Sequence, residues 1–303
     1  METLTFEGIL TALTTIHTGG DEKTGVENMM RKLEFIVEDE RELIPIIDGN
    51  SIRGNLRRLL LNDFFAQIGY TIKTPRLFYM LSGGALEEVS SQETGTMNLQ
   101  LRREIRAMIP PLSLLGCSMG NQAFAGKLVV AKALPICREL NDFIPPQSKL
   151  SFHEYITESF ATRRAEREMP EAIQANQRAE EPTIQMKVSL ECFAPGTRFY
   201  HKFMVLDATP IEKSCFARMV ELWRERPFVG GKSAVGYGEI KIDYPKLTLT
   251  SETYLNWLQE NKEGITRTLA GIDKVQAPVT KQTAFKKKDK ELPIEVKPLD
   301  DAA

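Results

Sequence analysis

The sequence is poor in the residues that build metal centres and disulfide frameworks. Its 303 residues include four cysteines and three histidines. Zinc sites need closely grouped ligands, and disulfide frameworks need paired cysteines. The sequence therefore predicts neither, and we expect no bound metal and no other cofactor. The cysteines stand far apart, without a CxxC pair, at Cys117, Cys137, Cys192 and Cys215.

Long apolar runs are missing as well. No stretch approaches the ~18 apolar residues that a membrane span requires. The start METLTFEGIL lacks the basic residues and the apolar core of a signal peptide. We therefore expect a cytoplasmic protein with no membrane partner. With 42% apolar and 26% charged residues, the chain has the ordinary composition of a globular protein that buries a core.

The chain carries no excess of positive charge and no familiar catalytic signature. Its formal net charge is -2, so a nucleic-acid-binding surface has to be built from local basic patches. The sequence contains no Ser-His-Asp signature, no HExxH helix and no repeated Asp cluster. We therefore predict that the protein is not a self-sufficient enzyme.

The apolar pattern of the first half predicts strands and one long helix. Residues 3–16 alternate apolar with polar side chains, which predicts a half-buried strand, and residues 32–37 and the run GKLVVAKALPI from Gly126 predict further strands. Asp48 supplies N-cap chemistry for a helix whose apolar residues recur at the helical period from Ile52 onward. The stretch 75–111 predicts no definite element.

The second half adds the elements that indicate the fold class. The runs IQMKVSLECF and TRFYHKFMVLD are separated by Ala-Pro-Gly at 194–196 and predict a β-hairpin. A helix over about 210–224 and a final strand follow. Strands interleaved with helices predict an α+β fold of ferredoxin-like type. We expect one domain over 1–250 with a polar excursion at about 148–185, a helical segment over 251–274 and a disordered basic tail over 275–303.

Two segments combine glycine or a helix start with basic residues. After the first strand, HTGGDEKTG places backbone N-H groups beside a lysine, which suits a phosphate, although a plain glycine loop would look the same. The segment DGNSIRGNLRR places arginines in the first turns of a helix, where dipole and charge both favour phosphate; the alternative is a solvated basic face. The candidate RNA-binding residues here are His17, Thr18, Gly19, Gly20, Lys23, Ser51, Arg53, Gly54, Arg57 and Arg58.

Two further segments are candidates for RNA contacts. The segment FVGGKSAVGYGEI is so rich in glycine that it indicates a close backbone contact or, alternatively, a bulge before the last strand. The run TRRAERE lies in the polar excursion, where solvated surface is the alternative. The candidates here are Gly230, Gly231, Lys232, Ser233, Arg163, Arg164 and Arg167.

In this order, the segments resemble the RAMP superfamily, specifically the backbone subunits of CRISPR effector complexes. The matching pieces span most of residues 3–244: IHTGGDEKTGVEN, LIPIIDGNSIRGNLRRLL, LLGCSMGNQAFAGKLVVAKA, LECFAPGTRFYHKFMV and FVGGKSAVGYGEI. The resemblance implies an RRM-like palm with an inserted thumb in the excursion at about 148–185. It also implies a guide RNA (crRNA), a complementary target nucleic acid, other effector subunits and a filament of copies as partners.

The type IV backbone subunit is the most similar form, and the type III form is next. In the type III form an aspartate after the first loop cuts the target RNA, and the matching position here holds Glu27, with Asp21 nearby. The longer glutamate side chain displaces the carboxylate, and small misplacements are costly to catalysis. We therefore expect a binding subunit without a catalytic residue. The alternatives are a metal-dependent RNA endonuclease that uses Glu27 or Asp21, and an RNA-processing enzyme with His17 as general base.

Overall fold

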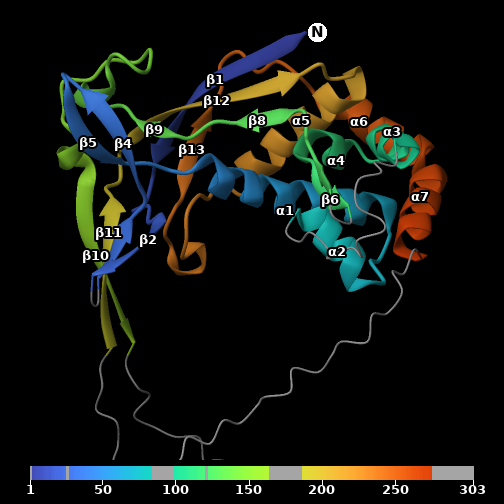
Figure 1. Ribbon diagram of the computed structural model, residues 1–303, viewed down its shortest axis with the longest axis horizontal. Helices are drawn as coiled ribbons and strands as arrows, with labels where there is room; N and C mark the ends of the chain where they lie inside the picture. The colour runs from blue at the N-terminus through green and yellow to red at the C-terminus, as the bar shows by residue number, and fades with distance from the viewer. Residues whose placement is uncertain (1, 25–26, 84–98, 120–121, 164–185, 275–303) are drawn as a thin grey trace, which may run out of the picture.

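A five-stranded antiparallel sheet forms the centre of the fold (Figure 1). The computed structural model describes residues 2–24, 27–83, 99–119, 122–163 and 186–274. Four strands follow one another in the order β13-β1-β12-β8, and the short β9 also pairs with β12. All of these pairings are antiparallel. The strands are β1 (Thr3–Ala12), β8 (Leu128–Val130), β9 (Leu134–Pro135), β12 (Arg198–Leu206) and β13 (Ile240–Asp243).

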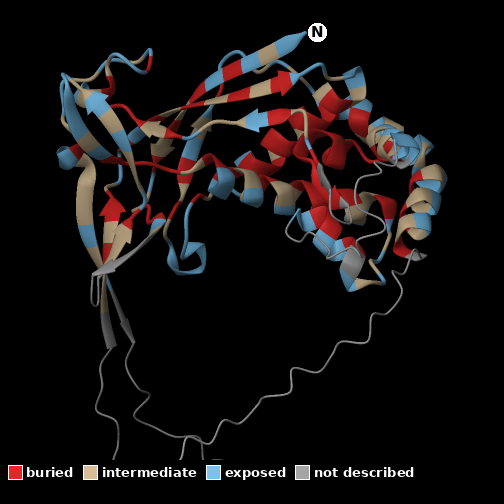
Figure 2. Ribbon diagram, in the orientation of Figure 1, coloured by how far each residue is buried: buried red, intermediate tan, exposed pale blue. Residues whose placement is uncertain are grey.

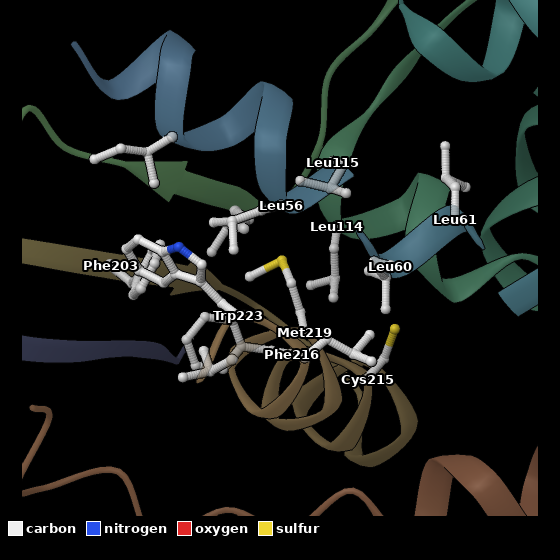
Figure 3. Close-up of a cluster of buried hydrophobic side chains, with 14 of the residues drawn as sticks. Leu56, Leu60, Leu61, Leu114, Leu115, Phe203, Cys215, Phe216, Met219 and Trp223 are labelled. Carbon is white, nitrogen blue, oxygen red and sulfur yellow. The ribbon is translucent and has the colours of Figure 1, made fainter. Parts of the chain in front are cut away.

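Two long helices pack against this sheet. In the chain, α1 (Gly49–Ile68) lies between β1 and β8, and α5 (Pro210–Glu225) lies between β12 and β13. The ring of Phe216 on α5 stacks on Phe6 at 5.2 Å and meets Phe203 edge to face at 5.4 Å. Figure 3 shows the apolar cluster between α1, α5 and the strands. The predicted α+β class is confirmed. The labelled side chains of the cluster are Leu56, Leu60, Leu61, Leu114, Leu115, Phe203, Cys215, Phe216, Met219 and Trp223.

Local sequence explains where both helices begin. The Asp48 side chain accepts a hydrogen bond from the Asn50 N-H and caps α1, as predicted from the sequence. The helix ends at Gly69, whose positive φ of 66° suits glycine. α5 begins with a capping box, in which Thr209 and Glu212 each satisfy a backbone N-H of the other. The two predicted helices are therefore confirmed.

A second group of strands lies at the left end of Figure 1. A four-stranded sheet has the order β10-β11-β3-β2, and β4 and β5 form a separate hairpin. A small apolar core, which includes Ile44, Leu140 and Phe152, fills the space beneath them. The elements are β2 (Gly19–Thr24), β3 (Glu27–Met30), β4 (Lys32–Val37), β5 (Glu40–Pro45), η1 (Arg138–Leu140), η2 (Phe152–Tyr155), β10 (Ile156–Arg163) and β11 (Met186–Phe193).

The predicted hairpin of residues 184–207 is wrong. β11 pairs with β10 and β3, whereas β12 pairs with β1, β8 and β9, so the two strands belong to different sheets. The turn between them is held by β1 and its continuation, because Gly196 N donates to Ala12 O and Phe193 N donates to Ile16 O. The predicted strand from Gly126 is split into β8 and β9.

Helices occupy the right side of Figure 1. The chain enters α2 through a loop that Asp273 holds, because its carboxylate accepts hydrogen bonds from Tyr70 Oη, Lys73 N and Thr74 N. Within the described part of the chain, no helix is long and apolar enough to cross a membrane. The predicted tail over 275–303 lies outside the described residues. The remaining elements are α2 (Pro75–Ser82), α3 (Leu99–Met108), α4 (Pro110–Leu115), β6 (Cys117–Met119), β7 (Gln122–Phe124), η3 (Ser233–Val235), α6 (Glu252–Glu260) and α7 (Lys262–Lys274).

Candidate nucleic-acid interface

Three segments that lie far apart in the sequence meet next to the start of α1. The loop after β1 contacts the glycine-rich loop, because Gly231 N donates to His17 O at 3.0 Å. It also reaches the start of α1 through a backbone relay: Arg31 N donates to Thr18 O, and Ile46 N donates to Arg31 O. The Asn55 side chain on α1 donates to Phe228 O, at the base of the glycine-rich loop. Hydrogen bonds therefore link three of the predicted motifs to one another.

The two residues that begin the first motif are structural. His17 and Thr18 are buried. His17 Nδ1 lies 2.8 Å from Glu191 O, and Thr18 Oγ1 donates to Ile46 O at 3.1 Å. Both side chains thus hold the loop between β11 and the segment that leads into α1. Gly19, by contrast, is exposed, and Gly20 is half-buried.

Three charged side chains gather at the start of α1: the cap residue Asp48 and two cations from other segments. Asp48 caps the helix, and its carboxylate lies 3.2 Å from Arg31 and 3.8 Å from Lys132. Two cations against one carboxylate leave the helix start positive, and the helix dipole adds to this charge. Asn50, Ser51 and Gly54 are exposed on this turn. Sequence reasoning missed Arg31 and Lys132, since Arg31 lies between β3 and β4 and Lys132 lies between β8 and β9, both outside the helix.

Arg53 and Arg57 bind main-chain carbonyl groups of the protein itself. Arg53 donates to Leu128 O and Leu115 O, both at 2.7 Å. Arg57 donates to Leu115 O at 2.5 Å and to Ser82 O at 2.6 Å. Burial lowers the pKa of both guanidinium groups, and the charge of Arg53 lowers the pKa of Arg57 further.

These contacts give the two arginines a structural role in holding α1 to α2, α4 and β8. Their predicted phosphate contacts stay a prediction. Arg58, the third candidate on this helix, is exposed.

The glycine-rich loop between Val229 and Gly238 is fixed at its base and exposed at its tip. Gly230 has a positive φ of 74°, and a Cβ there would collide with His17 O. The loop closes where Val229 N donates to Gly238 O. Residues 230–236 are all exposed (Figure 2), including Gly231, Lys232 and Ser233, and the loop projects below α1 in Figure 1. Only glycine fits the junction with His17, which explains one glycine of the motif.

The sheet of β10 and β11 adjoins the glycine-rich loop. Ser159 Oγ on β10 and Tyr237 Oη are 2.6 Å apart. Lys32 Nζ forms an ion pair with Glu191 on β11 at 3.1 Å, and Glu191 also accepts from Met30 N. Arg163 is the last residue of β10. The candidates Arg164 and Arg167, and the rest of the excursion over 164–185, lie outside the described residues.

The two alternative catalytic carboxylates belong to neighbouring strands. Asp21 lies in β2, as does Lys23, and Glu27 is the first residue of β3, where it pairs with Thr24 on β2 and with Ser189 on β11. Among the described residues, no group of three or more His, Cys, Asp or Glu side chains is placed to hold a metal ion. Cleavage by either carboxylate stays an untested alternative.

The fold has a counterpart among solved structures. A chain described as "Type IV-B CRISPR Complex" matches with a TM-score of 0.58 and 17% sequence identity, and the match covers 80% of this chain and 92% of that chain. At this identity the match shows a shared fold. No protein-family model and no curated protein matches the sequence.

Proposed function

We propose that this protein is a guide-RNA-binding backbone subunit of a CRISPR effector ribonucleoprotein. The observation that carries the proposal is that hydrogen bonds link the three predicted motifs beside the start of α1. The fold shared with a type IV-B CRISPR complex chain supports the same assignment. In this proposal the partners are a guide RNA, a complementary target nucleic acid, other effector subunits and further copies of the chain in a filament.

The five-stranded sheet with α1 and α5 is, in this proposal, the ferredoxin-like palm. Its strand order and the places of the two helices in the chain fit that topology: the second strand of the motif is β8, the third is β12 and the fourth is β13. The excursion that leaves the four-stranded sheet through β10 and returns through β11 is the thumb. The residues of the excursion over 164–185 lie outside the described part of the chain.

The surface suits a phosphate backbone because exposed cations lie beside exposed glycines, which carry no side chain. Exposed glycines at positions 19, 54 and 231 allow close approach, since a Cβ there would have no neighbouring atom closer than 3.9 Å. Arg31, Lys132 and Lys232 supply positive charge, and their side chains reach solvent. Contacts of this kind bind RNA without reading its sequence.

A binding assay with matched charge changes tests the proposal. The double variant Arg58→Ala and Lys232→Ala removes two exposed cations from the surface. The control pair Lys241→Ala and Lys246→Ala removes one exposed cation on β13 and one shortly after it. We expect only the first pair to weaken binding of single-stranded RNA, equally for different sequences. The plot of the logarithm of the binding constant against the logarithm of the salt concentration should also become less steep. Its slope should decrease in magnitude by about 0.7 for each phosphate that is no longer neutralised. Equal effects of the two pairs would contradict the proposed surface.

A further inference from the structure

The tip of the glycine-rich loop carries a lysine where the backbone favours a glycine. Lys232 has a positive φ of 62°, a left-handed conformation that a long side chain rarely adopts. The residue before it, Gly231, lies outside that conformation and has no atom within 4 Å of its Cβ position, so the fold does not require a glycine there. The fold alone would therefore favour the two residue types in the opposite order.

Strained residues of this kind persist only where the surrounding structure fixes them, and they cluster at functional sites. Lys232 is exposed, and within the part of the chain that the structure describes its ammonium group forms no ion pair. Its charge acts toward β11: burial raises the pKa of Cys192 to about 11, the charge of Glu191 raises it further, and the charge of Lys232 opposes both. The cation is therefore available to a ligand that lies beside β11.

Tyr237 ties the strained residue to the neighbouring sheet. Its backbone N-H donates to Lys232 O at 3.4 Å, and Val235 N donates to the same oxygen at 3.0 Å. Its hydroxyl lies 2.6 Å from Ser159 Oγ on β10. The side-chain contact fixes Tyr237, and the two N-H groups hold the Lys232 carbonyl inside the turn. Together these contacts maintain the left-handed conformation.

A purely structural turn would not need this arrangement. A glycine at position 232 would accept the same hydrogen bonds without strain, because the contacts use only its main-chain oxygen. A larger residue at position 231 would restrict the unfolded chain and so favour folding. Each residue therefore lowers stability where it stands, and a ligand that contacts both explains their presence.

We propose that Tyr237 is a positioning residue for Lys232. It holds the left-handed conformation that directs the lysine ammonium group to a phosphate of the RNA, and the open space at Gly231 admits that phosphate next to the main chain. A lysine binds a phosphate as a point charge and does not read the bases. This inference rests on the proposed RNA-binding function, and it names a residue on which binding depends through another side chain.

Urea denaturation without RNA tests the strain. Lys232→Gly should raise the folding equilibrium constant by about two- to fivefold, because relief of the strain outweighs the added freedom of the unfolded chain. In a Tyr237→Phe background the gain should be smaller, since the loop has lost the contact that enforces the strain. Asp39→Gly, at an exposed residue with φ 67° in the turn between β4 and β5, is the control and should have the same effect in both backgrounds. An equal gain for Lys232→Gly in both backgrounds overturns the inference.

A double-mutant cycle on the binding of a short single-stranded oligouridine tests the positioning role. Lys232→Ala should weaken binding about fivefold, and the plot of log binding constant against log salt concentration should lose about 0.7 of its slope. Tyr237→Phe should weaken binding about threefold in the unmodified protein and should have no effect beside Lys232→Ala, because it acts only through the lysine. Ser159→Ala should reproduce both results for Tyr237→Phe.

The outcomes separate this inference from the proposed function. If the unmodified protein does not bind the oligouridine, the proposed function fails and the inference fails with it. If the protein binds, and Tyr237→Phe weakens binding equally with and without Lys232, the tyrosine has a role of its own and the inference alone is overturned. Unchanged binding by Lys232→Ala or by Tyr237→Phe overturns it as well. Asp39→Gly should bind normally, as expected if relief of backbone strain elsewhere does not affect the RNA.

Discussion

Gly230→Ala is expected to damage the candidate surface at the point where its segments join. The residue has φ 74°, a conformation that costs an alanine about 1–2 kcal/mol. The new Cβ would also collide with His17 O, so the loop must move away from His17. That movement breaks the hydrogen bond from Gly231 N to His17 O, which contributes about 0.5–1.5 kcal/mol. Together these effects predict a decrease of about 1.5–3.5 kcal/mol in the free energy of unfolding.

The adjacent Gly231→Ala is a matched control, because its φ lies outside the left-handed region and no atom lies within 4 Å of its Cβ position. Urea denaturation of both variants measures the difference, with an unchanged m-value as the sign that the unfolding reaction is the same. We expect Gly231→Ala to stay within about 0.5 kcal/mol of the unmodified protein. If the two variants are equally stable, the junction between Gly230 and His17 does not hold the loop.

Three further predictions concern stability, pH and catalysis. Arg53→Ala with Arg57→Ala should destabilise the fold by several kcal/mol, about 1–3 for each carbonyl group left unpaired in a buried place, whereas Arg58→Ala should leave the unfolding midpoint unchanged. Burial lowers the pKa of His201 from 6.5 to about 3, so the unfolded chain takes up a proton first as pH falls, and stability should drop by about 2 kcal/mol between pH 7 and 5. In His201→Gln, the free energy of unfolding from denaturation curves should no longer decrease in this way between pH 7 and 5. An unchanged decrease would mean that other groups cause it. For catalysis, the complex with guide RNA, labelled complementary RNA and Mg²⁺ or Mn²⁺ should give no cleavage. Fixed-interval products that disappear in Glu27→Ala would make the protein an endonuclease.

The sequence predicted the elements whose signals are local. The cap at Asp48 and the apolar period after it are enough to place α1. The helix expected over about 210–224 is α5, and its capping box of Thr209 and Glu212 is a local signal that the sequence also carries. The strand pairing of residues 186–206 was not predictable in this way. The turn at 194–196 was recognised correctly, but its hydrogen bonds to Ala12 and Ile16 direct the two strands into different sheets, and those contacts are long-range.

In the candidate site, too, the motifs could be predicted from the sequence, whereas roles that depend on tertiary contacts could not. Glycines and a helix start were visible in the sequence, and the structure brings the three segments together. The roles of Arg53 and Arg57 were not visible, because a basic pair four residues apart looks the same whether it faces solvent or the carbonyl of Leu115. Arg31 and Lys132 were missed because only the fold places them beside Asp48.

The anchoring of the glycine-rich loop lowers the entropy cost of binding a ligand there. Four glycines in nine residues make the free chain flexible. The folded loop is nevertheless held at three points: Gly231 N donates to His17 O, Gly238 N donates to Thr15 O, and Tyr237 Oη lies within hydrogen-bond distance of Ser159 Oγ. The cost of ordering it is therefore met during folding, so a ligand that contacts it meets a pre-organised receptor. Removal of the Tyr237 hydroxyl would transfer part of that cost to the binding step and make the entropy of association less favourable.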